Sequence, residues 1–216
     1  MFTYAGPVEE GPVLDQPPVM VSLATPTPEI TQAPYLTGEE SFAPSTPLPA
    51  ALPPGWPTAP SNRVTTRVVV RDLALNLAVI PQGDEDYPYC GVAQYLLRLG
   101  QPGGGRATYL YAHARAGMFL PILDASKIRN GQKMLGMIVD AYTSDDLNFP
   151  YEIVQVRRHQ VSLGDAFAVA TEQLWLQTSE GPRGTPGKTQ VIARPHSIGP
   201  ANPADAHPVA RPRACD

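Results

Sequence analysis

The stretch Thr108-Tyr-Leu-Tyr-Ala-His-Ala-Arg-Ala-Gly-Met-Phe-Leu-Pro121 reads as a strand that ends on His113 and then turns through small residues into an apolar patch. A second stretch, Leu174-Trp-Leu-Gln-Thr-Ser-Glu180, has the same form and ends on Ser179. A third, Lys188-Thr-Gln-Val-Ile-Ala-Arg194, begins with a cation and continues as a strand. Three strands that each deliver one polar group predict a single site.

Proline and charge divide the 216 residues into three parts. Fourteen of the 26 Pro lie in residues 1–60, which hold six acidic residues and no Lys or Arg. Because Pro fixes φ and removes a backbone donor, residues 1–62 are predicted to be a Pro-rich, acidic, disordered linker. Residues 63–196 are predicted to fold as one domain and residues 197–216 to form a disordered tail. The folded part has no strong charge bias, so nucleic acid is not an expected partner.

The remaining composition narrows the class of protein further. The two cysteines, Cys90 and Cys215, allow one bridge but not a disulfide framework. The four His have no Cys partner at zinc spacing, so neither a metal nor a cofactor is expected. No apolar run approaches the length of a membrane span, and no signal peptide is visible. Taken literally, these features indicate the cytoplasm, but a Pro-rich segment of this kind often spaces a domain away from a membrane or wall.

Short strands joined by turns dominate the pattern between residues 63 and 196. One short helix is predicted at 91–98, where apolar residues recur at helical spacing, and one helical turn at 124–129. Residues 101–105 form a Gly-rich loop without the Lys-Ser/Thr of a phosphate-binding loop. Strands are predicted at 67–71, 73–80, 107–112, 134–142, 150–158, 171–178 and 189–194. This organisation is typical of an all-β barrel or sandwich.

The three opening stretches together resemble the motifs of sortases, the Gram-positive cell-wall transpeptidases. The strand ending on His113, followed by Phe119, is similar to the sortase histidine motif. Leu174-Trp-Leu-Gln-Thr-Ser179 resembles the motif Thr-Leu-x-Thr-Cys, with Ser179 in place of the nucleophilic Cys. Lys188 stands where that family has its catalytic Arg. The resemblance covers roughly residues 63–196.

This resemblance implies a closed eight-stranded β-barrel with one or two short helices. It also implies a bacterial enzyme outside the cytoplasm, associated with the cell surface, although no membrane anchor is seen in this chain. The implied partners are a protein or peptide with a C-terminal sorting signal and an amine acceptor of the cell envelope. A monomer is expected.

The chemistry of acyl transfer assigns roles to the candidate residues. A Ser hydroxyl needs a base within hydrogen-bond reach, and His113 is the candidate base for Ser179. Glu180 is a candidate to orient that imidazole. Arg presents a fixed fork to an oxyanion, whereas Lys188 presents a mobile point charge, so Arg183 and Arg194 are kept as alternative cations. Cys90, at the start of the predicted helix, is either a displaced nucleophile or a buried core residue.

Three functions are compatible with these residues. The first is a sortase-like acyltransferase or peptidase that uses Ser179 and His113 through an acyl intermediate. The second is a sortase-fold module that has lost catalysis and binds peptide or cell-wall ligands in its groove. The third is a hydrolase in which water takes the acyl group. Loss of both the Cys and the Arg favours the second function, and retention of the whole His113 segment favours the other two.

Overall fold

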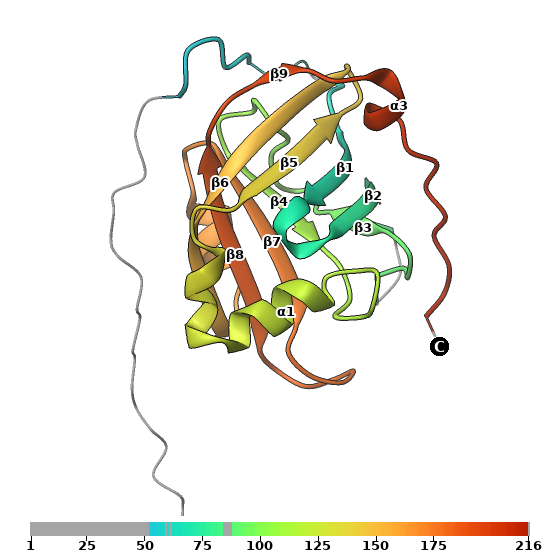
Figure 1. Cartoon of the computed structure of the whole chain (residues 1–216), viewed down its shortest axis with the longest axis vertical. Coiled ribbons are helices and arrows are strands. Elements are labelled where there is room, and N and C mark those ends of the chain that lie inside the picture. Colours follow the sequence, from blue (N-terminus) through green and yellow to red (C-terminus); the bar gives the residue numbers. More distant parts are fainter. Residues whose placement is uncertain (1–51, 59, 61, 84–87, 216) are drawn as a thin grey trace, which may run out of the picture. The chain divides into compact units, whose positions relative to one another are not determined.

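A computed structural model describes residues 52–58, 60, 62–83 and 88–215. The predicted linker, residues 1–62, lies mostly outside these described residues. Within them, nine strands form one continuous sheet (Figure 1). The strands are β1 (Thr65–Val70), β2 (Leu75–Pro81), β3 (Ala93–Tyr95), β4 (Ala107–Tyr111), β5 (Ile138–Thr143), β6 (Leu147–Gln160), β7 (Gln173–Ser179), β8 (Lys188–Pro195) and β9 (Gly199–Pro200).

The sheet closes into a barrel because β5 and β6, which lie at the two ends of a run of eight strands, pair with each other. The order is β5-β1-β2-β3-β4-β7-β8-β6, and β6 pairs back onto β5. The two-residue strand β9 adds to the beginning of β6. Neighbours are antiparallel except β2–β3 and β4–β7, which are parallel. The prediction of a closed, eight-stranded, all-β barrel is confirmed, and closure leaves the ring without unpaired edges.

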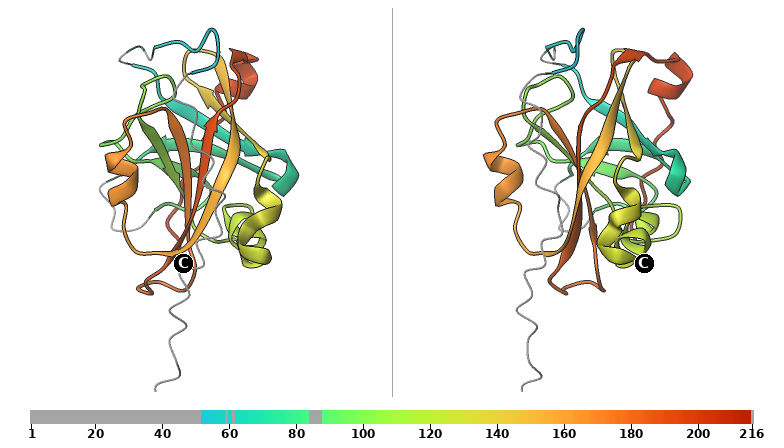
Figure 2. Two further views of the ribbon diagram at one scale, coloured as in Figure 1. Left: turned by 90° about the vertical axis from the view of Figure 1, so that its left-hand side faces the viewer. Right: turned by 60° about the vertical axis from the view of Figure 1, so that its left-hand side comes forward.

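Helices are few and short, and α1 and α2 lie on different sides of the barrel (Figure 2). None of the helices in the described residues is long and apolar enough to cross a membrane. The helical elements are η1 (Arg71–Leu73), α1 (Leu120–Lys127), η2 (Arg129–Met134), α2 (Gly164–Ala168) and α3 (Pro203–Ala206). One or two were expected, and the additional helix α3 lies in the predicted tail.

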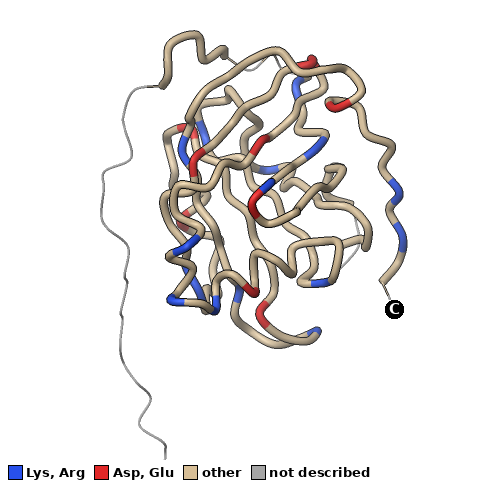
Figure 3. Tube along the Cα trace, viewed as in Figure 1, with Lys and Arg blue, Asp and Glu red and all other residues tan. Residues whose placement is uncertain are grey.

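Apolar side chains from alternate strand positions fill the barrel. Phe119, Phe149 and Tyr151 are fully buried, and Trp56 packs edge-on against the last two with ring centroids 5.1 and 5.5 Å away. Trp56 therefore attaches the end of the predicted linker to the domain. Charged residues of both signs are spread along the chain of the domain (Figure 3), as the even charge balance of this part of the sequence indicates.

The prediction of a helix at residues 91–98 is wrong. Residues 93–95 instead form β3, which pairs with β2 through Val79–Ala93 and with β4 through Tyr95–Leu110. Tyr95, one of the apolar residues whose spacing suggests a helix, instead lies on a strand between two partner strands. Leu97 remains 62 % exposed. Tertiary pairing overrides a short local pattern here. The turn predicted at 124–129 begins earlier, because Pro121 fits the first turn of α1.

The disordered tail predicted for residues 197–216 is also wrong for residues 197–215. This segment forms β9 and α3, and Asn202 caps α3 by accepting a hydrogen bond from the Ala204 N–H at 3.0 Å. The Arg67 guanidinium holds Asp205 at 2.6 Å. Beyond α3, Arg213 pairs with Cys90, and a disulfide joins Cys90 to Cys215. Local composition does not reveal the ion pair or the disulfide, because their partners are distant in sequence.

Substitution of Gly131 is expected to destabilise the domain by about 2–4 kcal/mol. Gly131 lies in η2 with φ +75°, and a Cβ there would come within 2.6 Å of the Val156 side chain. Gly131→Ala adds this overlap to backbone strain. Gly136→Ala is the matched control, because Gly136 has φ +85° but open space around its Cβ position. Chemical denaturation should show a loss of about 1 kcal/mol for the control, and equal losses would contradict the packing argument.

Candidate active site

The parallel pair β4–β7 brings His113 and Ser179 to the same end of the barrel. Tyr111 lies opposite Gln177 in this pair. Beyond that point, the Ala112 N–H donates to the Gln177 carbonyl at 3.2 Å, and the Thr178 hydroxyl donates to the Ala112 carbonyl at 3.0 Å. Parallel strands run in one direction, so the residues that follow both strands emerge together.

The antiparallel strand β8 brings Lys188 to the same place. Ser179, the last residue of β7, lies directly opposite Lys188, the first residue of β8. The Lys188 ammonium donates a hydrogen bond from Nζ to the Ser179 Oγ at 2.9 Å. Both side chains are half-buried. A cation therefore touches the candidate nucleophile directly.

An open cleft of about 880 Å³ contains all three side chains. His113, Ser179 and Lys188 border it, together with Arg183 from the β7–β8 loop and Cys215 from the C-terminal segment. Burial raises the pKa of Tyr111, another bordering residue, to about 12. Tyr111 therefore stays neutral at physiological pH.

His113 is held by the backbone of a neighbouring segment. Its Nε2 lies 2.6 Å from the Pro88 carbonyl oxygen, which can only accept a hydrogen bond. This contact places a proton on Nε2 and so selects the tautomer of the neutral ring. The His113 carbonyl accepts a hydrogen bond from the Phe119 N–H at 3.0 Å, which fixes the turn after β4.

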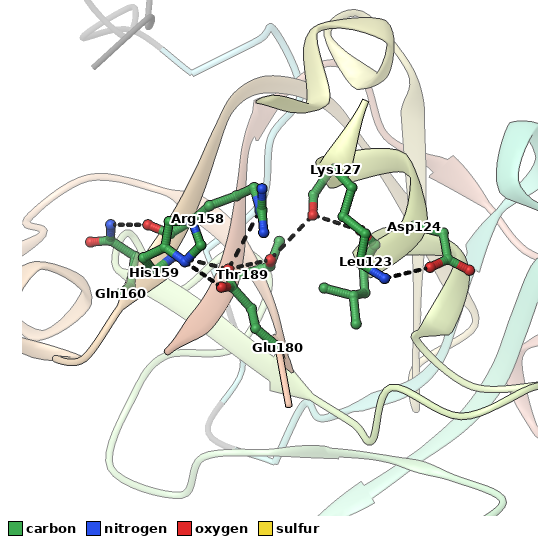
Figure 4. Close-up of polar contacts among 9 residues, drawn as sticks. Leu123, Asp124, Lys127, Arg158, His159, Gln160, Glu180 and Thr189 are labelled. Atoms are coloured by element: carbon green, nitrogen blue, oxygen red, sulfur yellow. Dashed lines mark hydrogen bonds and ion pairs between the residues drawn. The ribbon is translucent and has the colours of Figure 1, made fainter. Parts of the chain in front are cut away.

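Glu180 binds His159 and Thr189. Its Oε2 lies 2.6 Å from His159 Nδ1, and its Oε1 accepts hydrogen bonds at 2.8 Å from the His159 N–H and the Thr189 hydroxyl (Figure 4). Thr189 in turn contacts Ser126 of α1 at 3.3 Å. The expectation that Glu180 orients His113 is therefore not supported, because both carboxylate oxygens are engaged on the β6–β8 side. The network fixes the residue next to Ser179.

Glu180 is expected to stabilise the fold in a pH-dependent way. Burial raises its pKa, but hydrogen bonds from His159 and Thr189 and the nearby charges of His159 and Arg158 outweigh burial and hold it below the ordinary 4.5. A depressed carboxyl pKa stabilises the folded state above the unfolded pKa, and this stabilisation is lost as the pH falls through the folded pKa. Glu180→Gln should cost about 1–2 kcal/mol at pH 7.

The measurement is urea denaturation of wild type and Glu180→Gln between pH 7 and pH 3. The difference in unfolding free energy should shrink as the pH falls below about 4.5. Asp124→Asn is the control, since Asp124 is 57 % exposed and pairs with Lys127 on the surface of α1. A pH-independent difference for Glu180→Gln would contradict the assignment.

The two alternative cations lie in different places. Arg183 borders the cleft. Arg194 lies at the far end of β8, where its guanidinium holds the Glu152 carboxylate at 2.7 and 3.0 Å. Sequence alternation places Lys188 and Arg194 on one face without separating them, and the structure assigns Lys188 to the cleft and Arg194 to a lateral ion pair.

The two cysteines and His113 form a cluster that sequence spacing does not reveal. Cys90 and Cys215 are joined in a disulfide with Cα atoms 5.3 Å apart, so Cys90 is not a free thiol in this state. The two sulfurs and a ring nitrogen of His113 lie within 4.8 Å of one another. Two thiolates and an imidazole would suit Zn²⁺, but disulfide sulfurs are not thiolate ligands. The group therefore does not provide a thiolate metal site in the oxidised protein.

Comparison with known proteins supports the fold assignment. No protein-family model and no curated protein sequence matches the chain. Among solved structures, sortase A of Listeria monocytogenes is similar with a TM-score of 0.50 and 13% identity, over 65% of this chain and 92% of that one. Sortase C of Streptococcus pneumoniae is similar with a TM-score of 0.50 and 16% identity, over 66% of this chain and 72% of that one. The chain has the sortase fold.

Proposed function

We propose that this chain is a sortase-like acyltransferase or peptidase that cleaves a peptide through an acyl intermediate on Ser179. The observation that carries the proposal is the 2.9 Å hydrogen bond from Lys188 Nζ to Ser179 Oγ, in the cleft that His113 also borders. A nucleophile, a base and a cation are the parts that acyl transfer needs. The sortase fold adds support by analogy of fold.

In the proposed reaction, His113 takes the hydroxyl proton of Ser179, directly or through one water. The Ser179 oxygen attacks the scissile carbonyl, and the C–N bond breaks as the imidazolium returns the proton to the leaving amine. Lys188 donates to Ser179 and therefore serves as the positive charge that stabilises developing negative oxygen. An acceptor amine, or water, then attacks the ester and regenerates the Ser179 hydroxyl.

The substrate is proposed to be a protein or peptide with a sorting signal near its C-terminus, and the acceptor an amine of the cell envelope. The cleft is open to solvent and has a volume of about 880 Å³, which gives room for a peptide segment. Action outside the cytoplasm at the cell surface, as a monomer, is part of the same proposal. The disulfide between Cys90 and Cys215 supports an oxidising compartment.

The test is turnover of a fluorogenic sorting-signal peptide, with and without an amine acceptor. Wild type should release the product, and Ser179→Ala should not, while Ser162→Ala, a control at an exposed Ser outside the cleft, should match wild type. Faster release with amine present identifies transfer, and equal release identifies hydrolysis. Activity retained in Ser179→Ala but lost in Cys90→Ala would move the nucleophile away from Ser179.

One observation favours a second function, a module that binds peptide or cell-wall ligands without cleaving them. Glu180, the adjacent carboxylate, holds His159 rather than His113, so it does not supply the third member of a Ser-His-carboxylate triad. Under this alternative, wild type binds the labelled peptide without turnover, and only Ser179→Cys cleaves it. Cleavage by wild type excludes the alternative.

A further inference from the structure

The C-terminal strap, defined as residues 207–215, borders the cleft with its last two residues. It follows α3 along the side of the barrel (Figure 1). Two backbone hydrogen bonds, at 2.9 and 3.1 Å, pair Arg213 with Cys90, and the disulfide ties Cys215 to the same residue. Ala214 and Cys215 border the cleft that holds His113 and Ser179. The Cys215 end of the disulfide therefore borders the cleft.

The two sulfurs differ in access. Cys90 is 4 % exposed, whereas Cys215 is half-buried and borders both the cleft and an adjoining hollow of about 320 Å³. His113 reaches the same spot, because the Pro88 carbonyl lies 2.6 Å from His113 Nε2 and 3.6 Å from Cys215 Sγ. A nucleophile that enters the cleft meets Cys215 beside an imidazole.

We propose that Cys90–Cys215 is a redox-active disulfide that small or protein dithiols reduce through Cys215, and that His113 activates the Cys215 thiol so released. A thiolate of the dithiol attacks the Cys215 sulfur, and the S–S bond breaks with Cys90 leaving as thiolate. The second thiol of the reductant then attacks the mixed disulfide and releases Cys215. Two electrons and two protons pass to the protein, and the dithiol becomes a cyclic disulfide.

The reduced pair is expected to stay in place. The two backbone hydrogen bonds between Cys90 and Arg213 do not depend on the sulfurs, and the ion pair of Arg67 with Asp205 holds α3 just before the strap. Cys215 therefore remains at the cleft wall beside His113, and because Nε2 of that ring donates to the Pro88 carbonyl, Nδ1 is the nitrogen that would accept the thiol proton. A thiolate paired with an imidazolium is a stronger nucleophile at neutral pH than an ordinary thiol.

Other charges also act on this thiol, so the contribution of His113 must be separated from theirs. They include four cations and one carboxylate, and two tyrosines complete the titratable groups of the two hollows. These groups are Arg115, Arg183, Lys188, Arg213, Glu180, Tyr89 and Tyr111. Because these groups are present in every variant below, a difference in Cys215 titration between variants with and without His113 measures the effect of the imidazole.

The experiment measures alkylation by iodoacetamide, located by mass spectrometry, as a function of pH. The full chain is used as Cys90→Ser, which leaves Cys215 as its single thiol, and as reduced wild type. In both, Cys215 should titrate at least about one pH unit below an ordinary thiol at 8.5, which is roughly tenfold faster alkylation at pH 7. Adding His113→Gln should return the profile toward 8.5, and adding His196→Gln, an exposed control, should leave it unchanged.

Reduction of wild type is followed with dithiothreitol in the absence of denaturant. Reduction with retention of the far-UV spectrum is the expected result. A disulfide that dithiothreitol opens only in denaturant, or a Cys215 profile that His113→Gln does not move, overturns the proposal. Reduced wild type keeps the test independent of whether Cys90→Ser folds. Neither readout requires peptide turnover, so failure here is distinguishable from failure of the proposed acyl transfer.

Discussion

Lys188→Met should lower the rate of peptide cleavage by about 10²–10³-fold while leaving stability nearly unchanged. Lys188 donates to Ser179 Oγ at 2.9 Å, so its charge lies where the attacking oxygen and the tetrahedral intermediate become negative. Met keeps the length of the side chain and removes only that charge. Because Lys188 is half-buried at the first position of β8, few packing contacts are lost.

Lys188→Arg separates charge from geometry. A guanidinium retains the positive charge and presents its N–H donors in a fixed fork. It should therefore keep activity within about tenfold of wild type or raise it. The measurement is kcat/KM with the fluorogenic peptide, alongside Arg194→Met, whose ion pair with Glu152 lies outside the cleft. Equal losses in Lys188→Met and Arg194→Met would contradict the assignment of Lys188.

The fold and the meeting of three strand ends are predictable because both rest on strong local signals. Alternating or β-branched runs define most strands, and a strand that ends on a polar residue shows where its side chain is delivered. Parallel pairing of β4 with β7 and antiparallel pairing of β7 with β8 then place His113, Ser179 and Lys188 at one end of the barrel. The order of the three stretches along the chain is the order of the sortase motifs that they resemble.

The features that sequence reasoning missed all depend on contacts between distant residues. The disulfide joins residues separated by 125 positions. Glu180 is next to Ser179 in sequence, yet its carboxylate turns toward His159, which has φ +58° at the end of β6. The number of Cys does not reveal that Cys90 and Cys215 pair, and the position of Glu180 beside Ser179 does not reveal where its carboxylate points. A tail rich in Pro and Ala looks disordered until its partner on the barrel surface is known.

Glu172→Ala should destabilise the domain by about 3–5 kcal/mol, which corresponds to a lower Tm by roughly 10 °C. The Glu172 residue is 4 % exposed, and its carboxylate accepts three hydrogen bonds, from the Gly103 N–H at 2.9 Å, the Gly105 N–H at 2.7 Å and the Tyr151 hydroxyl at 2.7 Å. Alanine leaves these donors without their acceptor. The Gly-rich loop 101–105 is therefore anchored at the start of β4 and β7.

Glu172→Gln distinguishes lost hydrogen bonds from lost charge. Burial raises the pKa of Glu172 above 4.5, and its three donors together with the Arg63 charge offset only part of that effect. Ionisation of this carboxyl thus carries a desolvation penalty that a neutral amide avoids, although the amide has a single acceptor oxygen for three donors. Glu172→Gln should cost about 1–2 kcal/mol.

Tyr151→Phe and Glu172→Ala together form a double-mutant cycle, measured by thermal and urea denaturation. A coupling of about 1–2 kcal/mol is expected, because the hydroxyl of the fully buried Tyr151 donates a hydrogen bond to Glu172 and removal of either partner breaks it. Glu152→Ala is the control, since its half-exposed ion pair with Arg194 should contribute less than about 1 kcal/mol. Glu172 lies at the opposite end of β7 from Ser179, so a variant that remains folded should keep its cleft. Loss of turnover in folded Glu172→Gln would show that the register of β4 and β7, and with it the meeting of His113 and Ser179, depends on this buried carboxylate.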